Sequence, residues 1–376
     1  MPKKQHFTPL WQKIRDDYLE KIKNRTLLSG QLLPTEKMIA DEYNVSRITV
    51  VRAMNELAEL GYIIRRRGSG SVVNYNPKKN NESNIYTQTK TIALIMPVSA
   101  TRDYRVLNEI DRISRENGYI VSLYDSGKSI AKERDILKNL ININVSGIIS
   151  FPIQSIENID SYFSVCNSGI PLVFIDRTLP GLNVPCVKAN NFLGGKIITE
   201  HLLKKGHRNI CFFCYNRALF SESERFNGYI NALLEYNISP KSDYIIELFS
   251  NMPEDSMLFS NVAEENTLIR KQLYKIQHLT EPPTAIFCIN DDAAIKVQQQ
   301  ALSLGINIPK DLSIVGFDNS EHFMNTTSYI TTCAQDFEKI GSNAISLILA
   351  MINKEPLPFF EDVPVEVVER QSVAEI

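Results

Sequence analysis

The chain has 376 residues, of which 43% are hydrophobic and 22% charged, and its formal net charge at pH 7 is −2. This length exceeds what one hydrophobic core usually supports, so two or more domains are expected. The sequence contains no run of about 18 apolar residues, and no apolar stretch typical of a secretion signal follows its start. We therefore expect a cytoplasmic protein without a membrane segment.

The charge is distributed unevenly along the chain. Residues 1–75 hold 13 Lys and Arg against 8 Asp and Glu, whereas the remainder holds 28 against 35. Residues 74–90, "NYNPKKNNESNIYTQTK", have the polar composition of a linker. We predict a small basic domain over 1–75, a linker over 76–90 and a larger acidic domain over 91–376. A basic domain of this kind favours contact with a polyanion.

The first domain shows three helical patterns followed by two short strands. Apolar residues at four-residue spacing from Leu10 to Ile22 predict the first helix, and Thr35 is a candidate N-cap for the second. Ser46 is expected to cap a third helix that ends at Gly61. The stretch "GYIIRRRGSGSVVNY" then predicts two strands around a basic turn. Three helices and a basic hairpin are typical of a winged helix-turn-helix.

The second domain alternates short apolar runs with helical segments, which predicts parallel sheets in two lobes, with helices on both faces. Nine runs are predicted to be strands: "TIALIMP", "GYIVSLYD", "VSGIISFP", "GIPLVFID", "VPCVKAN", "NICFFCY", "DYIIELF", "TAIFCIN" and "LSIVGFD". Ligands of such sheets bind beyond the carboxyl ends of the strands. The fold class is therefore α/β, with an N-terminal winged helix-turn-helix and a two-lobed parallel-sheet domain.

In a helix-turn-helix the start of the second helix of the motif enters the major groove of DNA. Ser46 and Thr49 can bind phosphates, Arg47 can pair with guanine, and the arginines at 65–67 suit a wing along the backbone. The alternative for Arg47 or Arg52 taken alone is a solvated helix face.

The segment from Leu27 to Val73 resembles the winged-helix domain of the GntR family of bacterial regulators. The resemblance rests on "LPTE" at 33–36, "VSR" at 45–47, Thr49-Val50 and the wing glycines 68 and 70. It implies DNA contacts by Lys37, Arg47, Thr49 and Gly68. The candidate DNA-binding residues are Thr35, Lys37, Ser46, Arg47, Thr49, Arg52, Arg66, Arg67 and Gly68.

The chain departs from this family after Thr49-Val50. Relatives usually have Arg there, and this chain has Val51, which can contact a thymine methyl but cannot hydrogen-bond a base. Arg52 lies about 100° further around the helix and is expected at a phosphate. The operator is therefore expected to depart from the usual GntR half-site.

Polar side chains follow several of the predicted strands in the second domain. Monosaccharide hydroxyls are well held by planar Asp, Asn and Arg groups, although an Asp at a strand end can also cap the next helix. Residues 91–376 resemble the lactose/galactose-repressor and periplasmic sugar-binding family, through "GHRNI", "ERFNGYINAL" and "IPKDLSIVGFDNS" among other stretches. The resemblance implies effector contacts by Asp176, Arg177, Arg225, Asn290, Asp291, Asp318 and Gln335.

The loop after the first strand of this domain differs from the family. Relatives often have stacking aromatics there, whereas this chain has "SATRDYRVL". Tyr104, Arg102 or Asp103 could take their place, with Tyr104 the chosen candidate, and an inward Arg102 would favour an acidic sugar or a sugar phosphate.

The sequence lacks a phosphate-binding P-loop, a dinucleotide motif after a strand, a nucleophile elbow and a zinc-protease motif. Cys211 and Cys214 lie in the strand-like run "NICFFCY", which favours buried thiols over a metal or redox pair. We predict no enzymatic activity, no catalytic residues, no metal and no cofactor.

The combination of domains resembles arabinose-type repressors. It implies a homodimeric repressor that binds double-stranded operator DNA and is released by a monosaccharide such as L-arabinose. Other effectors stay open, namely a 6-deoxyhexose, a sugar phosphate or a nucleoside, as does a regulator resembling pyridoxal-phosphate enzymes.

Overall fold

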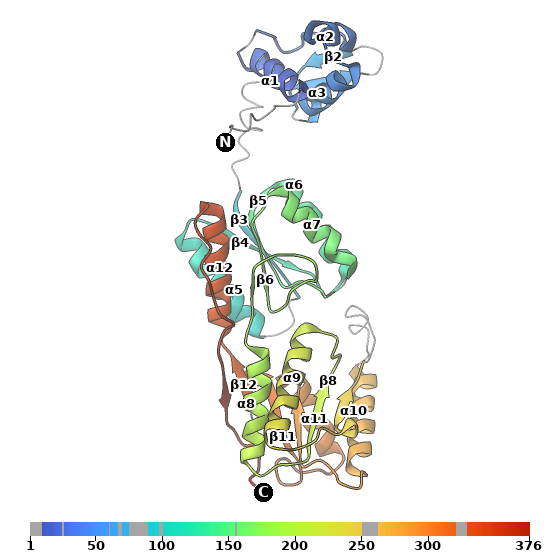
Figure 1. Ribbon diagram of the computed structural model, residues 1–376, viewed down its shortest axis with the longest axis vertical. Coiled ribbons are helices and arrows are strands. Elements are labelled where there is room, and N and C mark those ends of the chain that lie inside the picture. Colours follow the sequence, from blue (N-terminus) through green and yellow to red (C-terminus); the bar gives the residue numbers. More distant parts are fainter. Residues whose placement is uncertain are drawn as a thin grey trace, which may run out of the picture. The chain divides into compact units, whose positions relative to one another are not determined.

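The structure is a computed structural model of the chain, and it describes residues 10–24, 26–59, 61–66, 70–74, 89–97, 101–154, 156–249, 262–320 and 329–376. The chain divides into two compact units, Met1–Gln88 and Thr89–Ile376 (Figure 1). Residues 76–88 of the predicted linker lie outside the described residues.

The first unit contains three helices and a two-stranded antiparallel sheet. Its elements are α1 (Leu10–Lys23), α2 (Glu36–Tyr43), α3 (Arg47–Glu59), β1 (Ile63–Arg66) and β2 (Gly70–Val73). Ile63 pairs with Val73 and Arg66 with Gly70, so the strands form the hairpin that the sequence predicted. Residues from all three helices and both strands form one core, which fixes α3 against α1 and α2. The winged helix-turn-helix is confirmed.

The apolar stripe of α3 determines which of its faces is free. Val50, Ala53, Met54 and Leu57 are buried in the core of the unit. Because these positions share one side of a helix, the residues at 48, 52 and 55 lie on the opposite, exposed side.

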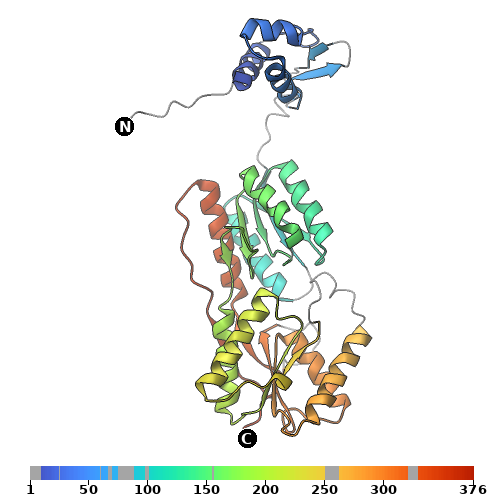
Figure 2. The ribbon, with the colours of Figure 1, turned by 45° about the vertical axis from the view of Figure 1, so that its right-hand side comes forward.

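The second unit has two lobes, each built on a mainly parallel sheet (Figure 2). The first sheet has the order β4-β3-β5-β6-β7. Its strands are β3 (Thr89–Met96), β4 (Ile120–Asp125), β5 (Val145–Ser150), β6 (Leu172–Ile175) and β7 (Cys186–Val187). Helices α5 (Thr101–Glu116), α6 (Ile130–Ile143), α7 (Ile159–Ser168) and α12 (Phe337–Asn353), with the short 3-10 helix η1 (Ile156–Asn158), complete this lobe.

Alternating residues of β3 build the two faces of the first sheet. Ile92, Leu94 and Met96 pack in one core with α5 and α12, whereas Ala93 and Ile95 pack in another with α6 and α7. A strand with both faces covered reads as a continuous apolar run, which is why its position could be predicted.

The second sheet has the order β13-β12-β11-β10-β8-β9. Its strands are β8 (Ile210–Cys214), β9 (Ile245–Glu247), β10 (Ala285–Cys288), β11 (Ser313–Asp318), β12 (Thr331–Gln335) and β13 (Val365–Val368). The other elements of this lobe are α8 (Asn191–Lys204), α9 (Phe220–Glu235), η2 (Ser242–Tyr244), α10 (Val262–Gln277) and α11 (Asp291–Ser303). All nine predicted strands are present, and β12 and β13 are additional, with β13 antiparallel to β12.

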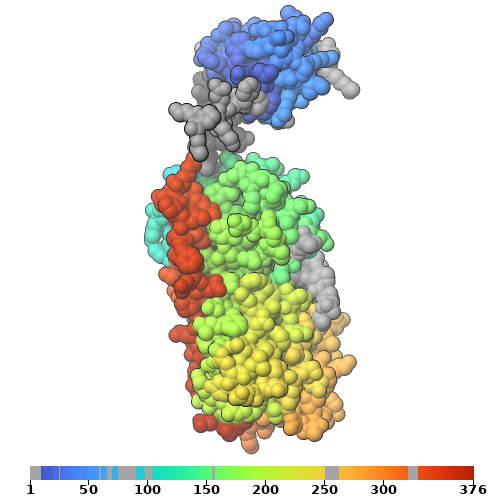
Figure 3. All heavy atoms as spheres, in the orientation of Figure 1, coloured from blue at the N-terminus to red at the C-terminus, as the bar shows by residue number. Residues whose placement is uncertain are grey.

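The chain passes between the lobes three times, through residues 188–190, at 336 and through 354–364. After the second passage α12 returns to the first lobe, and β13 then closes the edge of the second sheet. Figure 3 shows this C-terminal segment, in red, along one side of both lobes. The predicted α/β class with a two-lobed parallel-sheet domain is confirmed. No helix in the described residues is long and apolar enough to cross a bilayer.

Candidate functional site

Hydroxyl side chains cap the two helices of the helix-turn-helix. The Thr35 hydroxyl accepts a hydrogen bond from the Met38 amide at 3.3 Å at the start of α2. The Ser46 hydroxyl accepts one from the Thr49 amide, also at 3.3 Å, and lies 2.8 Å from the Thr49 hydroxyl. These contacts fix the first turns of both helices, where unpaired backbone amides favour an anion.

Glu36 of α2 holds two arginines of the predicted DNA-binding surface. Its carboxylate lies 3.0 Å from Nε of Arg47 and also pairs with Arg65 of β1, which donates to Asn55 on α3 as well. The side chain of Arg47 is nevertheless 76% exposed. Arg47 is therefore oriented by the fold and still open to a phosphate or a base edge.

The other candidates of this unit lie in different surroundings. Lys37 is exposed on the first turn of α2. The guanidinium of Arg52 stacks over Trp11 of α1, 4.2 Å from the ring centroid, so it leans away from the side of α3 that carries Arg47. Arg66 ends β1, with a side chain outside the described residues, and Arg67 and Gly68 lie outside them entirely.

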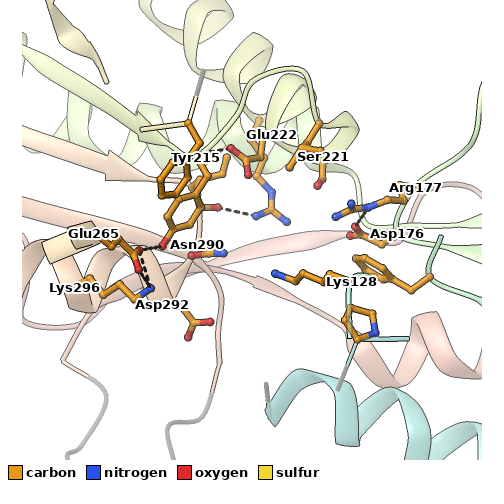
Figure 4. Close-up of a pocket in the computed structure, with 16 residues that line it drawn as sticks. Lys128, Asp176, Arg177, Tyr215, Ser221, Glu222, Glu265, Asn290, Asp292 and Lys296 are labelled. Carbon is orange, nitrogen blue, oxygen red and sulfur yellow. Dashed lines mark hydrogen bonds and ion pairs between the residues drawn. The ribbon is translucent and has the colours of Figure 1, made fainter. Parts of the chain in front are cut away.

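The second unit has a cavity of about 220 Å³ between its lobes (Figure 4). The first lobe contributes residues that follow the carboxyl ends of β3, β4, β5 and β6, and the second lobe contributes residues after β8, β9 and β10 and from three helices. The described lining residues are Pro97, Lys128, Phe151, Asp176, Arg177, Tyr215, Leu219, Ser221, Glu222, Arg225, Phe249, Glu265, Ile289, Asn290, Asp292 and Lys296.

Asp176 and Arg177 form the polar part of the wall on the first lobe. Asp176 has φ +68°, a left-handed conformation that turns the chain sharply after β6. Its carboxylate lies 3.3 Å from Nε of Arg177, and the Arg177 guanidinium stacks 4.4 Å from the ring centroid of Phe151. The pair presents a planar cation and a carboxylate side by side.

Arg225 of the second lobe makes several buried contacts at the cavity wall. It donates from Nε to Asn191 at 2.9 Å and from Nη1 to the carbonyl of Ile289 at 2.7 Å, and Nη2 lies 3.3 Å from the Asp318 carboxylate. The guanidinium also stacks 3.7 Å from the Phe317 ring centroid, and the residue is only 4% exposed. Arg225 thus ties α8, β10 and β11 together at the cavity wall.

Asn290 and Asp291 are neighbours with different roles. Asn290 lines the cavity and caps α11 by accepting from the Ala293 amide at 2.9 Å. Asp291 is buried behind it and accepts from the Thr332 hydroxyl at 2.7 Å and the Ser320 amide at 2.8 Å. Burial, with repulsion from Asp318 next in size, raises the pKa of Asp291 to about 7.

Three further candidates are not among the described lining residues. Asp318 lies behind Arg225 and accepts from Nε2 of Gln335 at 2.6 Å, so both form a second layer beneath the cavity. Tyr104 lies on α5 and is 47% exposed. Asp176, Arg177, Arg225 and Asn290 are the predicted residues that the structure brings together at the cavity.

Comparisons with known proteins agree with this division of the chain. Residues 10–73 match the bacterial regulatory proteins of the gntR family, and residues 199–373 match the periplasmic binding protein-like domain. The chain joins a GntR winged helix-turn-helix, called the GntR head below, to a periplasmic-binding-protein-like domain.

The similar proteins include transcriptional repressors and a regulator solved with a sugar. An arabinose metabolism transcriptional repressor of Geobacillus stearothermophilus is 28% identical over 99% of this chain and all of its own length. A repressor of the same name from Halalkalibacterium halodurans is 28% identical over 89% of this chain and 88% of its own. A periplasmic binding protein/LacI transcriptional regulator of Alkaliphilus metalliredigens, solved with D-xylulofuranose, is 25% identical with a TM-score of 0.61, over 76% of this chain and 99% of its own.

The cavity of the periplasmic-binding-protein-like domain includes residues that the sequence analysis did not name. Phe151 and Tyr215 lie at the ends of the predicted runs "VSGIISFP" and "NICFFCY", and Lys128 lies three residues after "GYIVSLYD", so a search of strand ends would have found them. Glu265 lies in the first turn of α10 and Lys296 lies within α11. The two side chains pair at 2.7 Å, and no pattern in the sequence indicated them.

The two lobes of this domain meet beside the cavity. The side-chain amide of Gln154, from the first lobe, donates to the Ala218 carbonyl at 2.8 Å and accepts from the Phe220 amide at 2.6 Å. Buried Glu133 supports the Gln154 loop by accepting from the Ile153 amide at 3.1 Å. Because Phe220 starts α9, this contact joins the first lobe to the helix that carries Arg225.

Proposed function

We propose that the chain is a DNA-binding transcriptional repressor whose effector is a neutral monosaccharide, with L-arabinose as the first candidate. The observation that carries the proposal is the polar cavity between the lobes, joined in one chain to a winged helix-turn-helix. The angle between the lobes would change when the effector binds in the cavity or leaves it.

The lining of the cavity supports a neutral, polyhydroxylated ligand. Among the described lining residues, the basic side chains Lys128, Arg177, Arg225 and Lys296 are equal in number to the acidic ones, Asp176, Glu222, Glu265 and Asp292. These described side chains offer both donors and acceptors to hydroxyl groups. Phe151, Tyr215 and Phe249 add apolar surface for the carbon face of a sugar ring.

The names of the relatives support a pentose as the effector of this chain. The two 28% identical relatives are called arabinose metabolism repressors, and the solved regulator holds D-xylulofuranose, also a five-carbon sugar. We infer that these relatives make a regulatory role without catalysis the better hypothesis for this chain.

We further infer that the repressor acts as a homodimer on a pseudo-palindromic operator. A dimer with two-fold symmetry presents two GntR heads, so its DNA site has matching half-sites. The Gln154 contact between the lobes would change when a ligand alters their angle, and that change would reach the heads through the linker. The sugar lowers operator affinity only by as much as it prefers the non-binding conformation.

The first test is a mobility-shift titration of the full chain on a palindromic fragment from its own promoter region. Specific binding should weaken steeply as salt rises, because Lys and Arg displace counterions from the phosphates. Binding that is absent at low salt would contradict the repressor.

The second test is a thermal-shift panel of pentoses, 6-deoxyhexoses, sugar phosphates and nucleosides on the same protein. A ligand that binds the folded state raises its melting temperature with concentration. We expect L-arabinose to give the largest rise. A rise only with a nucleoside or a phosphorylated sugar would replace the proposed effector class, and no rise with any member would contradict sugar sensing.

A further inference from the structure

Glu222 is a buried acidic residue at the cavity that no sequence pattern assigned to the effector. It lies in the first turn of α9, one turn before Arg225, and only 8% of its surface is exposed. Figure 4 shows its carboxylate at the cavity wall, between Tyr215 and Ser221.

Its two carboxylate oxygens have different environments. Oε2 accepts hydrogen bonds from the backbone amides of Tyr215 at 3.0 Å and Asn216 at 2.9 Å. These two bonds fix the side chain in one orientation. Oε1 takes part in no hydrogen bond with the described residues, although the residue lines the cavity. A carboxylate oxygen at the cavity wall can accept a hydrogen bond there from a ligand or from water.

The charges around the cavity act on Glu222 in opposite directions. Burial raises its pKa to about 7, whereas the two backbone amides, Arg225 and Arg177 lower that pKa by smaller amounts. The other charged or titratable groups that line the cavity are Lys128, Asp176, Tyr215, Glu265, Asp292 and Lys296. Glu222 is therefore poised to gain a proton when the cavity holds no donor and to lose it when one arrives.

We propose that Glu222 is a further effector-binding residue, whose Oε1 accepts a hydrogen bond from a ligand hydroxyl and makes effector affinity depend on pH near neutrality. The proposal rests on the proposed function, since it assumes a hydroxylated ligand in this cavity. It requires that the bound ligand place one donor hydroxyl within reach of α9. This hydroxyl would lie beside the ligand groups that Arg225 binds.

The direction of the pH effect follows from this contact. A hydroxyl that donates to Oε1 stabilises the ionised carboxylate, so ligand binding releases a proton below about pH 7. Affinity therefore falls as the solution is acidified from pH 8 to pH 6. A Glu222 that only fixes the loop before α9 would support ligand binding to the same extent at each pH.

The test is calorimetric titration of the full chain with L-arabinose at pH 6, 7 and 8, on the wild type and on Glu222→Gln. Glutamine keeps an acceptor for the two backbone amides but presents an amide to the cavity. We expect the variant to bind about tenfold to a hundredfold more weakly at pH 8, as for the loss of a hydrogen bond to a charged group. Its affinity should be flat across this pH range, whereas that of the wild type falls with acid.

Glu235→Gln is the matched control, because Glu235 ends the same helix at its exposed C-terminal end and pairs with Lys196. It should follow the wild-type profile. If Glu222→Gln binds as the wild type does, or loses affinity without losing the pH dependence, Glu222 is structural and the inference is wrong. If the wild type binds neither L-arabinose nor any pentose or 6-deoxyhexose of the panel, the proposed function is contradicted. The inference about Glu222, which rests on that function, is then contradicted as well.

A variant that fails to fold is recognised separately. Glu222→Gln should retain the far-ultraviolet circular dichroism and the sugar-free operator binding of the wild type. If it does not, Glu222→Asp provides the second measurement, because it keeps the charge but withdraws the carboxylate from the cavity. It should also bind L-arabinose more weakly, and unchanged affinity would overturn the inference.

Discussion

Val51 lies on the side of α3 that carries the proposed base-reading residues. It is one turn after Arg47 and one turn before Asn55, and both of these connect to the Glu36–Arg65 cluster. Val51→Arg should therefore place a second guanidinium beside Arg47 and shift operator preference towards guanine more than it changes overall affinity. Binding selection from a library of randomised half-sites measures this, with Val51→Ala as the control for lost volume. An unchanged preference would mean that Val51 does not face the groove.

Arg225 is both a proposed ligand-binding residue and a structural tie. Its removal leaves the Asp318 carboxylate buried without its cationic partner, which costs about 3–5 kcal/mol in buried pairs. Arg225→Ala should thus lower the melting temperature of the sugar-free protein by several degrees as well as abolish the sugar response. Arg217→Ala is the matched control, because that arginine pairs with Glu247 in the same lobe but is partly exposed. Equal stability of the two variants would contradict the structural role.

Asp291 should make stability depend on pH in the opposite sense to an ordinary paired carboxylate. Because its pKa is raised to about 7 from 3.8, the folded state binds more protons than the unfolded state between these values. Stability from this group is therefore complete below about pH 4 and is lost as the pH rises through about 7. Relative to the wild type, Asp291→Asn should become more stable as the pH rises from 5.5 to 8.5 in melting experiments without sugar. A constant difference between the two proteins would contradict the raised pKa.

At the scale of elements, two glycines determine how α8 and α9 pack. A Cβ on Gly195 would lie 2.2 Å from the Arg225 carbonyl oxygen, and one on Gly228 would lie 2.2 Å from that of Phe192. These contacts are between backbones, so the helices cannot keep this distance with any larger residue. Gly195→Ala should lower the melting temperature and weaken sugar binding, because the shift displaces Arg225. Asn227→Ala, at an exposed position of α9, should change neither.

The strands of the second unit were predictable because their residues are apolar on both faces. The nine runs named from the sequence became β3 to β11. β13 was missed, because its four residues are partly or fully exposed at a sheet edge after a long connection and pair antiparallel with β12. Its position depends on the third passage between the lobes, which local patterning does not encode.

The candidate site was predictable where it follows strands, whereas of its helical residues only Arg225 on α9 was named, through the family resemblance. Asp176, Arg177 and Asn290 end β-strand runs and lie at the cavity, as the strand-end rule implies. The rule could not separate Asn290 from Asp291, since the direction of each side chain depends on its partners in β12 and after β11. Glu222, Glu265 and Lys296 lie on helices whose inward faces only the tertiary structure defines.

At the scale of the whole molecule, the proposed repressor links two binding events within one chain. The cavity between the lobes and the winged helix-turn-helix belong to different compact units, and we propose that a change in conformation couples them. Such coupling is reciprocal: if L-arabinose weakens operator binding by a given factor, the operator must weaken L-arabinose binding by the same factor.

Reciprocity gives a quantitative prediction for the full chain. The dissociation constant of L-arabinose, measured with and without saturating operator, should rise by the factor by which saturating L-arabinose raises the operator dissociation constant. A DNA fragment of unrelated sequence at the same salt concentration is the control, and it should leave sugar affinity unchanged where it does not bind. Gln154→Ala should reduce both factors together, because it removes the contact between the first lobe and α9. If neither dissociation constant changes in the wild type, the sugar and the operator are not coupled, and the repressor mechanism proposed for this chain would be wrong.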